Sequence, residues 1–202
     1  MASKRNELCY GVLGATCVHL CVDMQRLFAK ETEWKTPWMD RVLPRVCQLV
    51  AAHPDRTIFT RFIPAEHPGE RAGTWRRYYE HWSAMTIEKL GREMIGLVPE
   101  LATFVPPAMV VDKRVYSPWY DNDLHTQLQG RSVNTLVVSG GETDVCVLST
   151  VLGAVDYRVI IATDALCSSS DETHDALLTV YENRYSQQVE AVSIDVILKN
   201  WT

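Results

Sequence analysis

The chain has 202 residues, of which 47% are hydrophobic and 22% charged, as is usual for a globular protein with one sizeable core. Its net charge of −5 arises without any cluster of Lys and Arg, so we expect neither nucleic acid nor a membrane surface as partner. Its apolar stretches are strand-length, well short of the roughly 20 residues of a membrane span. A small-molecule substrate is the favoured partner.

The N-terminal segment and the cysteines indicate the compartment. Residues 1–7 are polar and precede no long apolar segment, which argues against a secretory signal and favours a cytoplasmic location. The chain has 6 cysteines, yet most lie in predicted strands or helices rather than in a short, loop-rich domain. We therefore expect reduced thiols.

Strand-like and helical patterns alternate from the start of the chain. Residues 16–22 predict a strand, residues 37–52 an amphipathic helix and residues 56–62 a second strand, the pattern of a βαβ unit.

Residues 63–103 interrupt this alternation, and we interpret them as an insertion over the sheet edge. Two helices are expected within it, over residues 73–82 and 86–96. The first carries Trp75, Tyr78, Tyr79 and Trp82, which either pack in the core or form a lid or a subunit contact.

The alternation then resumes. Strands are expected over residues 109–113, 134–140, 158–163 and 189–192. Helices are expected over residues 122–129, 143–157 and 172–185, the last capped by Asp171, and at the C-terminus.

The first, fourth and fifth predicted strands are continuous apolar runs, which is typical of parallel strands covered on both faces. We predict a single domain over residues 1–202: a Rossmann-like three-layer α/β/α sandwich, with a doubly wound, mainly parallel sheet of about six strands.

Three chemically active side chains occur where predicted strands end. Ligands of such sheets bind outside the carboxyl ends of the strands. Asp23 follows the first strand, Lys113 ends the third and Cys146 follows the fourth, in a helix start that favours a thiolate. We expect all three on one rim as a catalytic set. The alternative is a strand-end cap, a solvated charge and a small buried thiol.

Motifs around these residues occur in a fixed order. They are Asp23-Met24-Gln25 with Phe28, Lys113 with Ser117, the run from Gly140 to Val147, and then Thr163-Asp164-Ala165 and His174. In order, strand context and spacing they resemble the signatures of isochorismatase-like cysteine hydrolases, over nearly the whole chain.

The resemblance implies a mechanism. Cys146 is the expected nucleophile, Asp23 its base and Lys113 the cation that favours charge separation. The backbone N–H groups of Glu142 and Cys146 are expected to form an oxyanion hole, beside a cis peptide between Gly141 and Glu142.

The implied activity is hydrolysis of a non-peptide C–N bond in a small amide, carbamoyl or ureido compound, through a thioester intermediate. An isochorismate-type vinyl-ether hydrolase and a non-catalytic binding protein of the same fold are the alternatives. The resemblance also implies a homo-oligomer, a dimer or a tetramer.

One departure separates the chain from the metal-binding nicotinamidases of the family. These enzymes carry an Asp-x-His metal motif after the second strand, and residues 59–67 lack it. We therefore expect no metal and no cofactor. Arg61, in this segment, either holds a substrate carboxylate or pairs with Glu66 or another surface acid.

Further residues are candidates for contact with substrate. The Glu142 carboxylate either accepts an amine or ureido N–H or points outward at the helix start. Four aromatic residues, Phe28, Tyr116, Trp119 and Tyr120, either wall a flat pocket or pack at a subunit interface.

Histidines give little evidence for a metal site. Cys17, His19 and Cys21 alternate along one strand face in a line pointing into a buried layer, without an evident fourth ligand. His125 is expected at an exposed helix start. We reject a metal site at both places.

Overall fold

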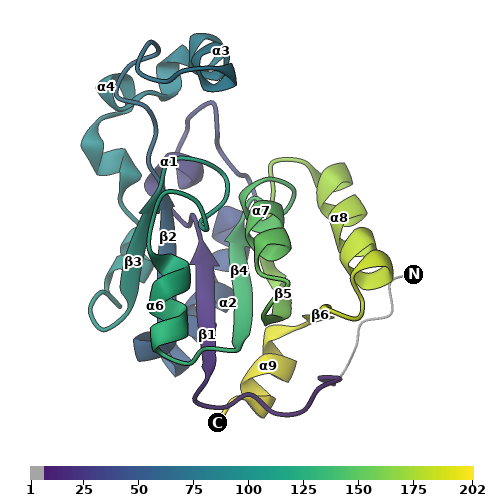
Figure 1. Ribbon diagram of the computed structural model, residues 1–202. Helices are drawn as coiled ribbons and strands as arrows, with labels where there is room; N and C mark the ends of the chain where they lie inside the picture. Colours follow the sequence, from purple (N-terminus) through teal and green to yellow (C-terminus); the bar gives the residue numbers. More distant parts are fainter. Residues whose placement is uncertain (1–6) are drawn as a thin grey trace.

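The computed structural model describes residues 7–202 and contains a parallel sheet of 6 strands (Figure 1). The strands are β1 Cys17–Val22, β2 Thr57–Phe62, β3 Met109–Lys113, β4 Thr135–Gly141, β5 Arg158–Cys167 and β6 Val189–Val192. Their order is β3-β2-β1-β4-β5-β6, and each neighbouring pair is parallel. The predicted doubly wound fold is confirmed.

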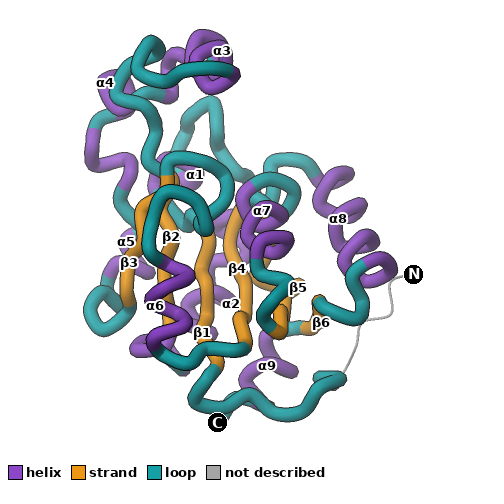
Figure 2. Tube along the Cα trace, viewed as in Figure 1, coloured by secondary structure: helices purple, strands orange, loops and turns teal. Residues whose placement is uncertain are grey.

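Helices cover both faces of the sheet, which makes three layers (Figures 1 and 2). On one face lie α2 Met39–Ala52 and α9 Ile194–Asn200, and on the other α6 Leu124–Gly130, α7 Cys146–Gly153 and α8 Asp171–Arg184. A separate apolar cluster fills the space on each side of the sheet. Two cores therefore hold the strand ends in fixed positions.

Strand β1 shows why the strands are apolar throughout. All of its residues are buried, and successive side chains enter opposite cores: Cys21 enters one, and Leu20 and Val22 the other. His19 forms hydrogen bonds with Thr57 and Ser139. Within residues 7–202, no group of three His, Cys, Asp or Glu side chains is placed to hold a metal ion.

The segment between β2 and β3 passes beyond the carboxyl ends of the strands and then returns alongside the sheet to the start of β3 (Figures 1 and 2). It contains α3 Thr74–His81, η2 Ser83–Met85, α4 Ile87–Leu90, η3 Arg92–Ile95 and α5 Pro99–Ala102. Its backbone is tied to the loop after β1, since Val98 N–H donates to Met24 O and Arg26 N–H to Gly96 O. The predicted helix over residues 86–96 is wrong, because Gly91 has a φ of 85° and divides it into α4 and η3.

Several helix boundaries also differ from the predictions. The predicted cap Asp171 is the first residue of α8, and Ser170 is the cap, since its side chain accepts from Thr173 N–H at 3.3 Å. Helix α7 begins at Cys146, later than predicted. The short elements α1 Arg26–Ala29 and η1 Pro54–Arg56 were not predicted.

Residues 1–6, which make up most of the polar start used above to argue against a secretory signal, lie outside the described residues. None of the helices in residues 7–202 combines the length and the apolar character needed to cross a bilayer.

The buried His19 makes stability depend on acidity. Burial lowers the pKa of His19 from 6.5 to about 3, so it stays neutral in the fold while the unfolded chain takes up a proton below about pH 6.5. The contribution of the neutral His19 to the free energy of unfolding is fully present above about pH 6.5. It falls by about 1.4 kcal/mol per pH unit as the pH drops from there towards 3. We expect His19→Gln to reduce the slope of unfolding free energy against pH by about this amount between about pH 6 and 4. Urea unfolding at a series of pH values measures this slope. A slope that is the same in His19→Gln and in the wild type would contradict the burial of a neutral His19.

The matched control is His67→Gln, at an exposed position. Its slope should equal that of the wild type.

Candidate active site

The three predicted catalytic side chains meet at the carboxyl ends of the strands. Lys113 Nζ lies 2.7 Å from Asp23 Oδ2 and 3.3 Å from Cys146 Sγ. All three residues are buried, with exposed fractions of 1% for Asp23, 1% for Lys113 and 6% for Cys146. The lysine therefore bridges the carboxylate and the thiol in one water-poor cluster.

Strand geometry produces this meeting. Asp23 directly follows β1, Lys113 is the last residue of β3 and Cys146 is the first of α7, which follows β4. In the sheet, β3 and β4 lie on either side of the β2–β1 pair. Lys113 and Cys146 therefore approach Asp23, at the end of β1, from opposite sides. Gly140 allows the close passage of β4, because its φ is 104° and a Cβ there would lie 2.1 Å from Val22 O.

Hydrogen bonds fix the side chain of Asp23 and that of Gln25, two residues later. Thr60 Oγ1 donates to Asp23 Oδ1 at 2.6 Å and accepts from the Asp23 N–H at 3.2 Å. Gln25 donates to the carbonyls of Phe62 and Ile95, and accepts from Phe62 N–H at 2.7 Å. Thr60 was not singled out from the sequence, because its role depends on the β1–β2 pairing rather than on a local motif.

Burial and charge set the protonation of the cluster. Burial raises the pKa of Cys146, Lys113 opposes this rise and Asp23 adds to it, so the resting thiol is protonated. Burial lowers the pKa of Lys113, but the negative charge of the Asp23 carboxylate and its hydrogen bond outweigh this effect and leave that pKa raised. Lys113 is therefore a permanent cation near neutral pH, and the thiol proton has a carboxylate acceptor close by.

Backbone donors are present next to the thiol. The peptide between Gly141 and Glu142 is cis, as predicted. The N–H groups of Thr143, Val145 and Val147 donate to backbone carbonyls. Within the described chain, the N–H groups of Glu142 and Cys146 have no such backbone acceptor, which leaves two donors beside the thiol.

A cavity of about 300 Å³ opens onto Cys146. Of the predicted substrate contacts, Phe28, Tyr116 and Glu142 line it. The half-buried Glu142 also accepts a hydrogen bond at Oε1 from Ser169 N–H at 2.9 Å, which fixes the carboxylate at the edge of the cavity.

The other predicted substrate contacts lie elsewhere. Arg61 pairs with Asp112, its register partner on β3, at 2.7 Å, as the surface-acid alternative expected, although the acid is not Glu66. Trp119 stacks on Tyr157 and donates to Thr150 O at 2.8 Å, and Tyr120 is 68% exposed. None of the three lines the Cys146 cavity.

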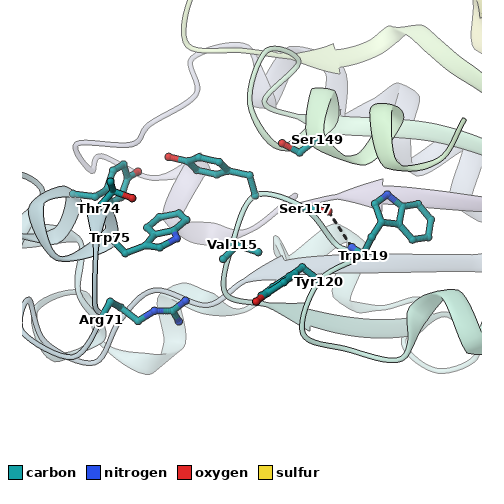
Figure 3. Close-up of a pocket in the computed structure, with 10 residues that line it drawn as sticks. Arg71, Thr74, Trp75, Val115, Ser117, Trp119, Tyr120 and Ser149 are labelled. Atoms are coloured by element: carbon teal, nitrogen blue, oxygen red, sulfur yellow. Dashed lines mark hydrogen bonds between the residues drawn. The ribbon is translucent and has the colours of Figure 1, made fainter.

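Trp119 and Tyr120 instead line a second, outer cavity of about 880 Å³ (Figure 3). Figure 3 shows Arg71 and Trp75 on one side of it and Tyr120 on the other. Tyr78 and Tyr116 line both cavities, so they form the wall between them. Of the aromatic side chains of α3, Tyr78 therefore lines the Cys146 cavity, Trp75 lines the outer cavity and also packs against the core, and Tyr79 is buried.

Sequence reasoning missed part of the inner cavity. Glu33, Trp34 and Lys35 line it from the loop after α1, and this loop carries no motif and no periodic pattern. Trp82 was noticed, but its place at the cavity depends on how the segment between β2 and β3 folds back.

The remaining residues singled out in the sequence, at positions 164, 174 and 125, form structural contacts. Asp164 binds Arg45 and accepts from Ile194 N–H. His174 Nδ1 lies 2.8 Å from Thr143 Oγ1, which supports the loop before Cys146. His125, predicted at an exposed helix start, forms a hydrogen bond with Tyr157.

Comparison with known proteins assigns the chain to a family. The family model of the isochorismatase domain matches residues 17–192. The chain belongs to the isochorismatase family. A curated relative from Arabidopsis thaliana, described as a probable inactive nicotinamidase, is 29% identical over 81% of this chain and 87% of its own length.

Solved structures show the same fold. A cysteine hydrolase from Pseudomonas syringae superposes with a TM-score of 0.80, at 21% identity over 96% of this chain and 98% of the other. N-carbamoylsarcosine amidase from Thermoplasma acidophilum gives a TM-score of 0.71, at 18% identity over 89% and 96% of the two chains.

The buried Asp23–Lys113 pair predicts a large effect on stability. Lys113→Met leaves the Asp23 carboxylate buried without its cation, and we expect a loss of about 3–5 kcal/mol in unfolding free energy. The double variant Asp23→Asn/Lys113→Met should recover at least about 1.5 kcal/mol of this, because no unpaired charge remains. Urea unfolding provides both values.

Arg61→Met is the matched control, since it breaks an ion pair whose side chains are 29% and 49% exposed. It should cost no more than about 1 kcal/mol. Equal losses for Lys113→Met and Arg61→Met would show that the buried pair has no special weight.

Proposed function

We propose that this member of the isochorismatase family is a cysteine-dependent hydrolase of a C–N bond in a small amide, carbamoyl or ureido compound. The observation that carries the proposal is the position of Lys113 Nζ, within 3.3 Å of the Cys146 thiol and 2.7 Å of the Asp23 carboxylate. A nucleophile, a base and a cation together are what attack on an unactivated carbonyl requires.

In the proposed reaction, Asp23 takes the thiol proton as Cys146 Sγ attacks the substrate carbonyl carbon. The Lys113 ammonium stabilises the sulfur as its negative charge develops, which offsets the raised pKa of the buried thiol. The N–H groups of Glu142 and Cys146 bind the oxyanion.

The tetrahedral adduct then collapses. Asp23 returns the proton to the departing nitrogen, the C–N bond breaks, and a thioester remains on Cys146. Asp23 then deprotonates a water molecule, which attacks the thioester carbonyl carbon. The C–S bond breaks, the acyl group leaves as a carboxylic acid, and Cys146 regains its proton from Asp23.

A non-catalytic binding protein is the second candidate, because the Arabidopsis relative is described as a probable inactive nicotinamidase. Vinyl-ether hydrolysis is a weaker candidate, since it gives the buried Cys146 thiol no role.

Release of ammonia from a panel of primary amides, ureas and carbamoyl compounds tests the proposal. Cys146→Ala should lower the rate by at least about a thousandfold, because the covalent route is lost. The matched control is Cys47→Ala, a half-buried cysteine on α2, which should keep the wild-type rate. A Cys146→Ala variant with more than about a tenth of the wild-type rate would contradict covalent catalysis.

A further inference from the structure

Aromatic rings surround the cavity above Cys146. The six that line it are Phe28, Trp34, Phe62, Tyr78, Trp82 and Tyr116. Trp34 is central to this aromatic box: its ring centroid lies 6.2 Å from that of Phe28, 5.8 Å from Phe62 and 5.7 Å from Tyr78. Ring faces carry partial negative charge and attract cations, most strongly when solvent is excluded.

Carboxylates add to this negative field. Glu33 and Glu142 both line the cavity, and the bond from Ser169 N–H holds Glu142 in place. Among the described lining residues, Lys35 is the cation, and it is ion-paired with Glu31.

The positive charge of Lys113 does not cancel the negative character of the cavity lining. Lys113 Nζ lies 5.2 Å from the Phe62 ring centroid, but its charge is matched by Asp23 at 2.7 Å. The lining as a whole therefore favours a positive ligand over a negative one. A substrate carboxylate would face Glu33 and Glu142, and no unpaired cation among the cavity-lining residues of the described chain would offset them.

We propose that the non-reacting part of the substrate is a small cation, an ammonium or alkylammonium group held between the aromatic box and the carboxylates of Glu33 and Glu142. This inference rests on the proposed function, and it narrows the substrate class to amides, carbamoyl or ureido compounds that carry a protonated or quaternary amine. The cavity volume of about 300 Å³ suits a compound of this size.

Thiol-specific reagents that differ only in charge provide the test. Trimethylammonioethyl and sulfonatoethyl methanethiosulfonate each form a disulfide with the Cys146 thiolate as methanesulfinate leaves, and peptide mass spectrometry separates Cys146 from the other cysteines. Each rate is divided by that of the same reagent with free mercaptoethanol. We expect the cationic reagent to modify Cys146 at least about tenfold faster than the anionic one.

Variants identify the cause of the preference. Trp34→Leu and Glu142→Gln should each lower the ratio by at least about threefold. Glu88→Gln removes an exposed carboxylate outside the cavity and should leave the ratio unchanged. A wild-type ratio near one or below one, or a ratio insensitive to both cavity variants, would overturn the inference.

Binding gives an answer independent of thiol chemistry, should neither reagent reach Cys146. By calorimetry, choline should bind at least about tenfold more tightly than its uncharged carbon isostere, dimethylbutanol. Equal affinity would overturn the inference.

The two proposals fail separately. If Cys146 shows no preference for the cationic reagent while ammonia release still depends on Cys146, the inference of a cationic substrate is wrong and the covalent mechanism stands. Ammonia release that survives Cys146→Ala removes the covalent mechanism.

Discussion

The ion pair between Asp23 and Lys113 is the interaction on which the site depends. Two opposite charges 2.7 Å apart are buried with exposed side-chain fractions of 0% and 1%. Such a pair is costly to desolvate and is stable only when each charge keeps its partner. Thr60 occupies the other carboxylate oxygen of Asp23, and Cys146 Sγ lies within reach of the ammonium. The thiol that contacts the pair is thus the nucleophile of the proposed reaction.

The pair also explains how a buried thiol can react. The raised pKa of Cys146 means that the free protein does not store a thiolate, so alkylation at rest is not the measure of its reactivity. In the proposed reaction, attack by Cys146 becomes favourable only as the proton moves to Asp23 beside a cation that is already fixed. This arrangement limits the nucleophile to substrates that fit the cavity, and it keeps the thiol less exposed to oxidation.

Much of the fold and the centre of the site could be predicted from the sequence. Continuous apolar strands required a sheet covered on both faces, and the residues after those strands had to share a rim. Strand order along the chain therefore predicts that Asp23, Lys113 and Cys146 lie together, as the distances show. Helix ends were less predictable, as Gly91 and Ser170 show, because each depends on one local backbone conformation or side-chain bond.

The residues that line the cavity could not be predicted in the same way. Arg61 was a plausible substrate contact until strand register paired it with Asp112. Trp34 and Glu33 reach the cavity because their loop packs Trp34 against Phe62 at the end of β2, which is a tertiary contact. Parallel-sheet topology therefore predicts which polar side chains meet at the ends of the strands, while the walls of the cavity around them depend on irregular segments.

The most direct test is to trap the covalent intermediate. During incubation with an amide that releases ammonia, rapid acid quenching and peptide mass spectrometry should show the acyl group of that substrate on Cys146, and no adduct in the Asp23→Asn protein. Ammonia release without any acyl adduct on Cys146, or with an adduct that forms equally well without the Asp23 carboxylate, would contradict the account.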